Sequence, residues 1–198
     1  MTKENNIMEK LGLTEDVLNN PRYKFKIFIQ TNDSFVALIG SSNCEFKLLE
    51  YIDNKLYVDK QEKELTWVKD FLFVCNQCQY SKMNLALEGK YLDILVDDKD
   101  AEVRMFVAKK GYGLNTLVKD ENQIVRYIVA KKGYGLKILV KDCCGIRQIV
   151  ADKGHCLDVL VNDSDWSVRY SADLWLKKHN LTLEEWAQKY PKRCALKK

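Results

Sequence analysis

One stretch of the chain reads Val103-Arg104-Met105-Phe106-Val107-Ala108-Lys109-Lys110-Gly111-Tyr112-Gly113-Leu114, and it returns almost unchanged at 125–136. The separation of Gly111 from Gly133 defines the period. A third copy occupies 146–157, one residue closer than this period requires, and a fourth begins at Val168 and breaks down at Trp175. Counting back one period from Gly111 reaches Gly89 in a degenerate opening copy. We therefore expect about four and a half repeats of 22 residues within 81–179.

The repeated positions predict a unit of two short helices. Asp100, Asn122 and Asp165 precede the first helix of their units, where a short side-chain oxygen accepts from main-chain amides that have no helical partner, so we expect them to be N-caps. The third copy has Cys143-Cys144-Gly145 there, which predicts the least well-capped helix. The first helix should end at a left-handed glycine and be followed by a second apolar segment. These glycines are Gly111, Gly133 and Gly154.

A single unit is too small to fold alone. Its five large aliphatic residues would contribute roughly 10 kcal/mol if fully buried. Ordering the main chain of one unit costs roughly 20 to 40 kcal/mol. Stability must therefore come from faces shared between neighbouring units, as in a solenoid.

The pattern Asp-x-x-Val-Arg-x-x-Val-Ala at 100–108 resembles the leucine-rich repeat variant family and the related short HEAT-like helical repeats. The resemblance covers residues 81–179, about half the chain. It implies an α-solenoid in which each α-helix pairs with a second short, often 3₁₀, helix, and in which the array coils into a right-handed superhelix. Family members usually carry prolines in the second half of the unit, where this chain has Gly-Tyr-Gly. The family shares a shape and no reaction, so the resemblance implies no activity.

Residues 1–64 have a different pattern. Apolar and basic residues alternate around Tyr23 and Phe25, which is typical of a half-buried strand. Polar turns at 31–34, 40–43 and 53–55 separate three further expected strands at 35–39, 44–52 and 56–58. We expect residues 1–64 to form a domain of a short N-terminal helix and a small antiparallel β-meander.

Residues 65–198 are expected to form the second domain. Leu65, Val68, Leu72 and Cys75 fall on one helical face, which predicts a linking helix at 65–79 packed on the sheet or on the first repeat. After the repeats, residues 182–185 have capping-box spacing and lead to Trp186, with Pro191 as a stop, so a capping helix should close the array. The expected fold class is α+β, a small N-terminal antiparallel β-meander followed by a C-terminal α-solenoid.

Composition restricts the class of protein. The 198 residues are 46% hydrophobic and 30% charged, and 32 basic against 28 acidic residues give a net charge of +4, too small to indicate nucleic-acid binding by itself. No run approaches the ~20 apolar residues of a membrane span, and residues 1–20 lack the apolar core of a signal peptide. The odd number of cysteines, seven, favours reduced thiols. We expect a cytoplasmic protein that does not bind membranes.

The chain contains few residues arranged for chemistry. Cys75 and Cys78 have a metal-like spacing, but structural zinc usually needs a second such pair, so a buried thiol is favoured over a metal or redox site. His155 replaces the repeated tyrosine, and neither it nor His179 belongs to a recognisable catalytic motif. We expect no enzyme activity, no catalytic residue, no metal, no cofactor and no small-molecule substrate.

Two basic columns recur with the repeat. Arg104, Arg126, Arg147 and Arg169 could bind phosphates, but aspartates recur at the same spacing (Asp98, Asp120, Asp142 and Asp163), which favours an internal structural ladder. Lys110, Lys132 and Lys153 have no equally regular acidic partner, and with Tyr112 and Tyr134 they form the candidate partner-binding strip. The alternative is that these lysines are present only because cations stabilise the C-terminal ends of helices, and that the tyrosines are packed side chains.

These observations lead to two hypotheses for function. The first is a non-enzymatic protein–protein interaction module, an adaptor or inhibitor that binds another protein through the repeat surface. The alternative is a HEAT-like protein that binds nucleic acid through the basic strip on its first two full repeats.

Overall fold

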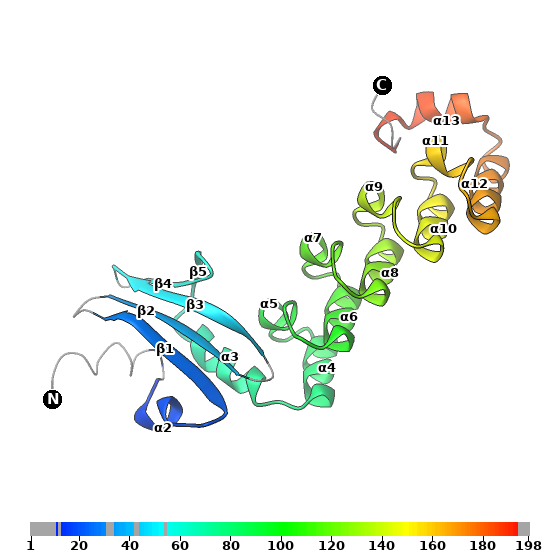
Figure 1. Ribbon diagram of the computed structural model, residues 1–198. Helices are drawn as coiled ribbons and strands as arrows, with labels where there is room; N and C mark the ends of the chain where they lie inside the picture. The colour runs from blue at the N-terminus through cyan, green and yellow to red at the C-terminus, as the bar shows by residue number, and fades with distance from the viewer. Residues whose placement is uncertain (1–10, 12, 31–33, 42–43, 54, 194–198) are drawn as a thin grey trace. The chain divides into compact units, whose positions relative to one another are not determined.

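The computed structural model describes residues 11, 13–30, 34–41, 44–53 and 55–193 (Figure 1). The fold is α+β, with an antiparallel sheet first and helices after it, as the sequence predicts. The chain divides into two compact units, 1–103 and 104–198, which are called here the sheet unit and the helical unit. Their boundary falls inside α6 (Ala101–Lys110), whereas the sequence places its division after residue 64.

The sheet of the first unit is a meander of five antiparallel strands in the order β1-β2-β3-β4-β5. Their bounds are Tyr23–Gln30, Phe35–Ser41, Cys44–Ile52, Lys55–Val58 and Gln61–Lys63. A short helix, α2 (Glu15–Leu18), precedes the sheet. Four strands were expected, and β5 was missed because its residues, Gln-Glu-Lys, show no apolar alternation.

The core of the sheet unit lies between alternating sheet residues and α3 (Trp67–Cys75). From the strands it takes Ala37, Ile39, Leu49, Tyr51, Leu56 and Val58, and from α3 it takes Val68, Phe71, Leu72, Val74 and Cys75. The Tyr23 hydroxyl of β1 donates to the carbonyl oxygen of Leu72 at 3.4 Å, which ties α3 to the sheet.

The expected linking helix at 65–79 is wrong in its bounds. Leu65 precedes α3, which ends at Cys75 with Asn76 as its C-cap. Cys78 is extended, with φ −72° and ψ 163°, and begins a separate helix, α4 (Gln79–Glu88). Periodicity could not reveal this break, because polar Asn76 and Gln77 fit the outer face of a continuous helix as well as they fit a turn.

Long and short helices alternate after α3. The long helices are α4, α6, α8 (Gln123–Lys131), α10 (Cys144–Asp152) and α12 (Trp166–Lys178). Their first residues recur at the period of the sequence repeat, which is shortened by one only before α10. The short helices are α5 (Leu92–Leu95), α7 (Leu114–Leu117), α9 (Leu136–Leu139) and α11 (Leu157–Leu160). Each is a single α-helical turn rather than the 3₁₀ turn that the resemblance implies.

The expected caps are confirmed. Asp100, Asn122 and Asp165 each accept from the main-chain N–H two residues later, at 2.8 to 2.9 Å. Cys143 makes no side-chain cap, so α10 lacks this bond as predicted. The glycines that end the long helices are left-handed, with φ of 83° at Gly111, 81° at Gly133 and 66° at Gly154.

A second left-handed position was missed by the sequence analysis. Gly113 and Gly135, just before the short helices, both have φ of 62°. Tyr91 and Cys156 take the same place in the opening and third copies, each with φ of 55°. The backbone turn is therefore kept even where glycine, the residue that adopts it at least cost, is absent.

In the helical unit α10 packs between α8 and α12, and α11 contacts both α12 and α13 (Leu183–Lys189) (Figure 1). The capping box of Thr182 and Glu185 is confirmed, and α13 ends before Pro191. Trp186 is fully buried, and its indole N–H donates to the carbonyl of Gly154 at 3.2 Å. Among the residues that the structure describes, no helix has both the length and the apolar character needed to cross a membrane.

Candidate interaction surfaces

Three arginines of the repeat bind aspartates that follow them in sequence at a constant separation. The Nε atoms of Arg104, Arg126 and Arg147 lie 2.7, 2.6 and 2.7 Å from carboxylate oxygens, and in each case Nη2 donates to the second oxygen. Their partners are Asp120, Asp142 and Asp163. Arg169 instead donates to the main-chain carbonyls of Asp163 at 2.6 Å and Ser164 at 3.0 Å.

These bonds occupy the guanidinium groups. The hydrogen bond from Arg126 lowers the pKa of Asp142, and the bond from Arg147 lowers the pKa of Asp163, because each favours the ionised carboxylate. A bidentate pair uses the donors that a phosphate would need. The arginine column therefore stabilises the framework of the repeat rather than offering sites to a ligand.

Lys82 belongs to the same column and was missed by the sequence analysis. It precedes Arg104 by one period of the repeat, and its Nζ is 2.7 Å from Oδ2 of Asp98. Both side chains are buried, 4% and 3% exposed. Counting back one period from Arg104 would have found this residue, but the opening copy carries lysine where the other copies carry arginine.

The expected partner-binding lysines lie at the C-terminal ends of successive long helices. Lys110 and Lys132 are exposed and Lys153 is half-buried, and within the described residues none of the three makes an ion pair. Tyr112 and Tyr134, in the turns that follow, are 41% and 43% exposed. The strip is thus accessible. Lysines that only stabilise the ends of helices would, however, occupy the same positions.

Charge is distributed unevenly between the two units. The sheet unit has 13 basic and 18 acidic residues, a net charge of −5, whereas the helical unit has 19 basic and 10 acidic residues, a net charge of +9. The modest net charge of the whole chain, +4, conceals this difference. The helical unit is therefore net basic and the sheet unit net acidic.

An apolar ridge on the outer faces of α8 and α12 was also missed. Trp166, Tyr170 and Leu174 are 71%, 61% and 49% exposed and recur at every fourth position, on one face of α12. Ile124 and Tyr127 of α8 are 54% and 37% exposed. Tyr127 and Tyr170 occupy the same position of their repeats, and this repetition was the available signal.

A pocket of about 370 Å³ brings together residue types found in hydrolases. It is lined by Asp152, Ser171, Leu174, Trp175, Lys178 and His179. Ser171 and His179 are eight positions apart along α12 and its C-cap, a separation of about 12 Å along a helix axis. The Nδ1 atom of His179 lies 2.7 Å from the carbonyl oxygen of Trp175. The pocket therefore does not align a nucleophile with a base.

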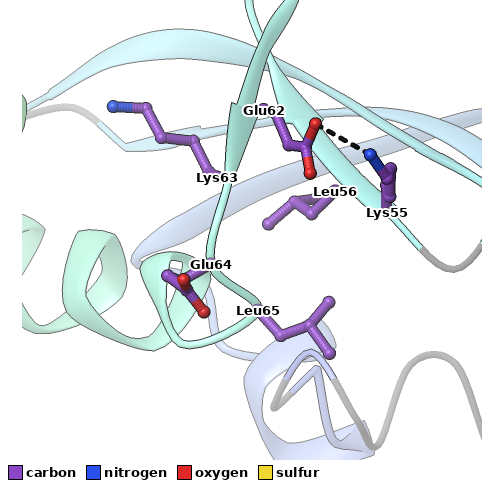
Figure 2. Close-up of a pocket in the computed structure, with 6 residues that line it drawn as sticks. All are labelled: Lys55, Leu56, Glu62, Lys63, Glu64 and Leu65. Carbon is purple, nitrogen blue, oxygen red and sulfur yellow. Dashed lines mark hydrogen bonds and ion pairs between the residues drawn. The ribbon is translucent and has the colours of Figure 1, made fainter.

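A second pocket lies beside β4 and β5 in the sheet unit (Figure 2). Its charged side chains are largely paired, since Lys55 Nζ lies 3.1 Å from Glu62 Oε2, and Lys63 points away from this pair and binds Asp93 at 3.3 Å. Lys55 and Glu62 are each more than half exposed. The pocket is therefore an open surface whose charges are mostly paired with one another or with Asp93.

The cysteine pair is divided between interior and surface. Cys75 is 3% exposed, Cys78 is exposed, and both are thiols rather than halves of a disulfide. Hydrogen bonds from the Ser81 side chain and main chain lower the pKa of Cys78. Within the described residues, no three His, Cys, Asp or Glu side chains gather as a metal site.

His155 is half-buried and its Nδ1 atom is enclosed without a hydrogen-bond partner in the described structure. Burial lowers its pKa, and the nearby charges of Arg193, Lys137 and Lys153 lower it further. His155 therefore takes up a proton less readily than a free histidine, and three cations act on it.

Comparison of the chain with protein-family models, with curated proteins and with solved structures finds no match.

Proposed function

We propose that the protein is a non-enzymatic binding module, an adaptor or inhibitor, whose repeats form an α-solenoid and whose helical unit binds an acidic partner protein. The apolar ridge of Ile124, Tyr127, Trp166, Tyr170 and Leu174 carries this proposal. Tyrosine and tryptophan are enriched where proteins bind one another, because they bury a large apolar area while keeping a polar group at the edge.

The charge around the ridge specifies the chemistry of the partner. Lys131 Nζ lies 5.5 Å from the centre of the Tyr127 ring, and Lys177 and Lys178 lie in the last turn of α12. With a net charge of +9 on the helical unit, these lysines favour a partner whose apolar groove is rimmed by carboxylates. The reduced cysteines support a cytoplasmic location for this encounter.

A solenoid accounts for the spacing of the ridge. Outward positions recur with each long helix, so side chains as distant in sequence as Tyr127 and Tyr170 contribute to one side of the array. The corresponding residue of α10 is Gln148. The ridge thus consists of two apolar patches with a polar position between them.

Affinity capture from the host of this protein tests the proposal. The tagged full chain should retain an acidic protein that the double variant Trp166→Ala/Tyr170→Ala loses, because that variant removes the two most exposed side chains of the ridge. Tyr80→Ala is the matched control, since Tyr80 of α4 is also 71% exposed but lies in the sheet unit. Equal capture by the double variant and the wild type would refute the proposal.

Nucleic-acid binding is the second candidate, and the unpaired lysine column favours it. Lys110, Lys132 and Lys153 recur at one position of the repeat, as contacts to a phosphate backbone would. Affinity for a labelled oligonucleotide should then fall steeply with salt, and Lys110→Glu/Lys132→Glu should abolish binding. Lys24→Glu, at an exposed position of the sheet unit, is the control. Binding that survives both salt and the double substitution would refute this candidate.

A further inference from the structure

Basic residues from three elements of the helical unit act electrostatically on His155. The main-chain carbonyl of Arg193 accepts from the N–H of Cys156 at 2.8 Å, so the 3₁₀ turn η1 (Pro191–Arg193) is held beside the residue that follows His155. The charges of Lys137 in α9, Lys153 at the end of α10 and Arg193 all act on the imidazole. These four residues are called here the His155 cluster.

Helix-end stabilisation does not explain this cluster. It accounts for Lys153, the C-cap of α10, but Lys137 lies in a single-turn helix and Arg193 in a 3₁₀ turn, neither of which has a sizeable dipole. Within the described residues, no carboxylate forms an ion pair with any of the three cations. Like charges brought together by separate elements repel one another unless an anion lies among them.

The arginine of the cluster is held in position. Its guanidinium carbon lies 4.5 Å from the centre of the Tyr190 ring, and its carbonyl bond to Cys156 fixes the main chain. A guanidinium with a defined orientation and two nearby ammonium groups match the several oxygens and multiple charge of a phosphate better than a single carboxylate.

The cluster also continues into the lysine strip. Lys153 Nζ lies 3.8 Å from the place that a Cβ on Gly133 would occupy, so it lies against the turn between Lys132 and Tyr134. A ligand bound at the cluster would therefore also contact the neighbouring residues of the lysine strip. This continuity favours a phosphate carried by a polymer over an isolated one.

We propose that the His155 cluster is a phosphate-binding site that takes a backbone phosphate of a nucleic-acid strand. The inference rests on the second candidate function, and it assigns to that function an anchoring point at the C-terminal end of the lysine strip. Lys137 and Arg193 supply the contacts that the strip alone lacks.

Two measurements distinguish a failure of the phosphate site from a failure of the nucleic-acid function. The first titrates the full chain with inorganic phosphate and follows the His155 imidazole resonances by NMR. The second measures oligonucleotide affinity by fluorescence anisotropy for the wild type, for Lys137→Gln, for Arg193→Gln and for the control Lys141→Gln, an exposed lysine outside the cluster. Each cluster variant should bind about tenfold more weakly and the control should bind as the wild type does.

The outcomes differ for the two proposals. Oligonucleotide binding that the cluster variants leave unchanged would overturn the site while leaving the candidate function standing. A phosphate-dependent shift of His155 without oligonucleotide binding would support the site for a free phosphate and overturn the nucleic-acid function. If only an Asp- and Glu-rich peptide binds, or if no anion perturbs His155, the phosphate site is wrong.

Discussion

Lys82 and Asp98 form an ion pair inside the sheet unit, with Nζ 2.7 Å from Oδ2 and both side chains buried. The pair has the same separation in sequence as Arg104 and Asp120 in the next copy. Asp98 also accepts from the main-chain N–H of Asp100 at 2.9 Å, so one carboxylate joins the lysine to the loop that precedes α6. The degenerate opening copy thus keeps the ion pair found in the later copies, although most of its other residues differ from theirs.

Replacing Lys82 with methionine should destabilise the protein strongly. The substitution leaves the Asp98 carboxylate buried without its cation, which costs about 3 to 5 kcal/mol. Lys55→Met is the matched control, because it breaks an exposed pair with Glu62 whose loss should change stability little. Urea unfolding, followed by circular dichroism, would measure the free energy of unfolding of both variants. Equal losses would show that the buried pair contributes no more to stability than the exposed pair.

Gly154→Ala should destabilise the protein more than Gly111→Ala does. Both positions are left-handed, so each substitution strains the backbone. A Cβ at Gly154 would also overlap the Trp175 ring, whereas a Cβ at Gly111 would meet no atom within 4 Å. The clash should add about 1 to 3 kcal/mol of destabilisation. Thermal unfolding of the two variants checks this ordering, which a lower midpoint for Gly111→Ala would contradict.

Lysine should be a poor substitute for arginine at Arg126. Arg126 binds both carboxylate oxygens of Asp142 and two main-chain carbonyls, and an ammonium group cannot span this set. Arg126→Lys should cost about 1 to 3 kcal/mol in the free energy of unfolding. Arg169→Lys should cost less, because Arg169 donates to carbonyls and makes no bidentate carboxylate bond in the described structure. Similar losses in urea unfolding would argue against the bidentate geometry as the source of stability.

His155 should make stability fall as pH drops below about 6.5. Its pKa is lowered in the folded chain by burial and by Arg193, Lys137 and Lys153, so the unfolded chain takes up a proton more readily. Stability is therefore full above the unfolded pKa, which is about 6.5, and declines as pH falls towards the folded pKa. His155→Tyr, which restores the residue of the earlier copies, should flatten this decline. Unfolding midpoints compared at neutral and mildly acidic pH check this, and an unchanged slope in the variant would exclude His155 as its cause.

Local rules predicted the features that depend on a few neighbouring residues. The caps at Asn122 and Asp165, the capping box at Thr182 and the left-handed glycine at 133 all follow from short-range main-chain hydrogen bonds and steric limits. The meander was predicted for the same reason, since polar turns separate its strands. Features of this kind need no knowledge of distant contacts.

Features that depend on distant contacts were missed. The residues next to Lys82 do not distinguish it from a surface lysine, and apart from its register with Arg104 only the fold shows that it meets Asp98 in the interior. Arg193 lies far from Lys137 in the chain, and the docking of α13 and η1 brings them to the same histidine. The charge difference between the units was missed because the sequence analysis divided the chain after residue 64, whereas the structure divides it after residue 103.

Each bond from an arginine Nε to an aspartate carboxylate lies within the span that runs from one ladder arginine to the residue before the next. Duplicating the span from one ladder arginine to the residue before the next would add a copy that brings both halves of its own bond. Such a chain could grow or shrink by whole modules without any of these carboxylate bonds losing its partner, so recombination between near-identical copies in its gene could change the number of repeats.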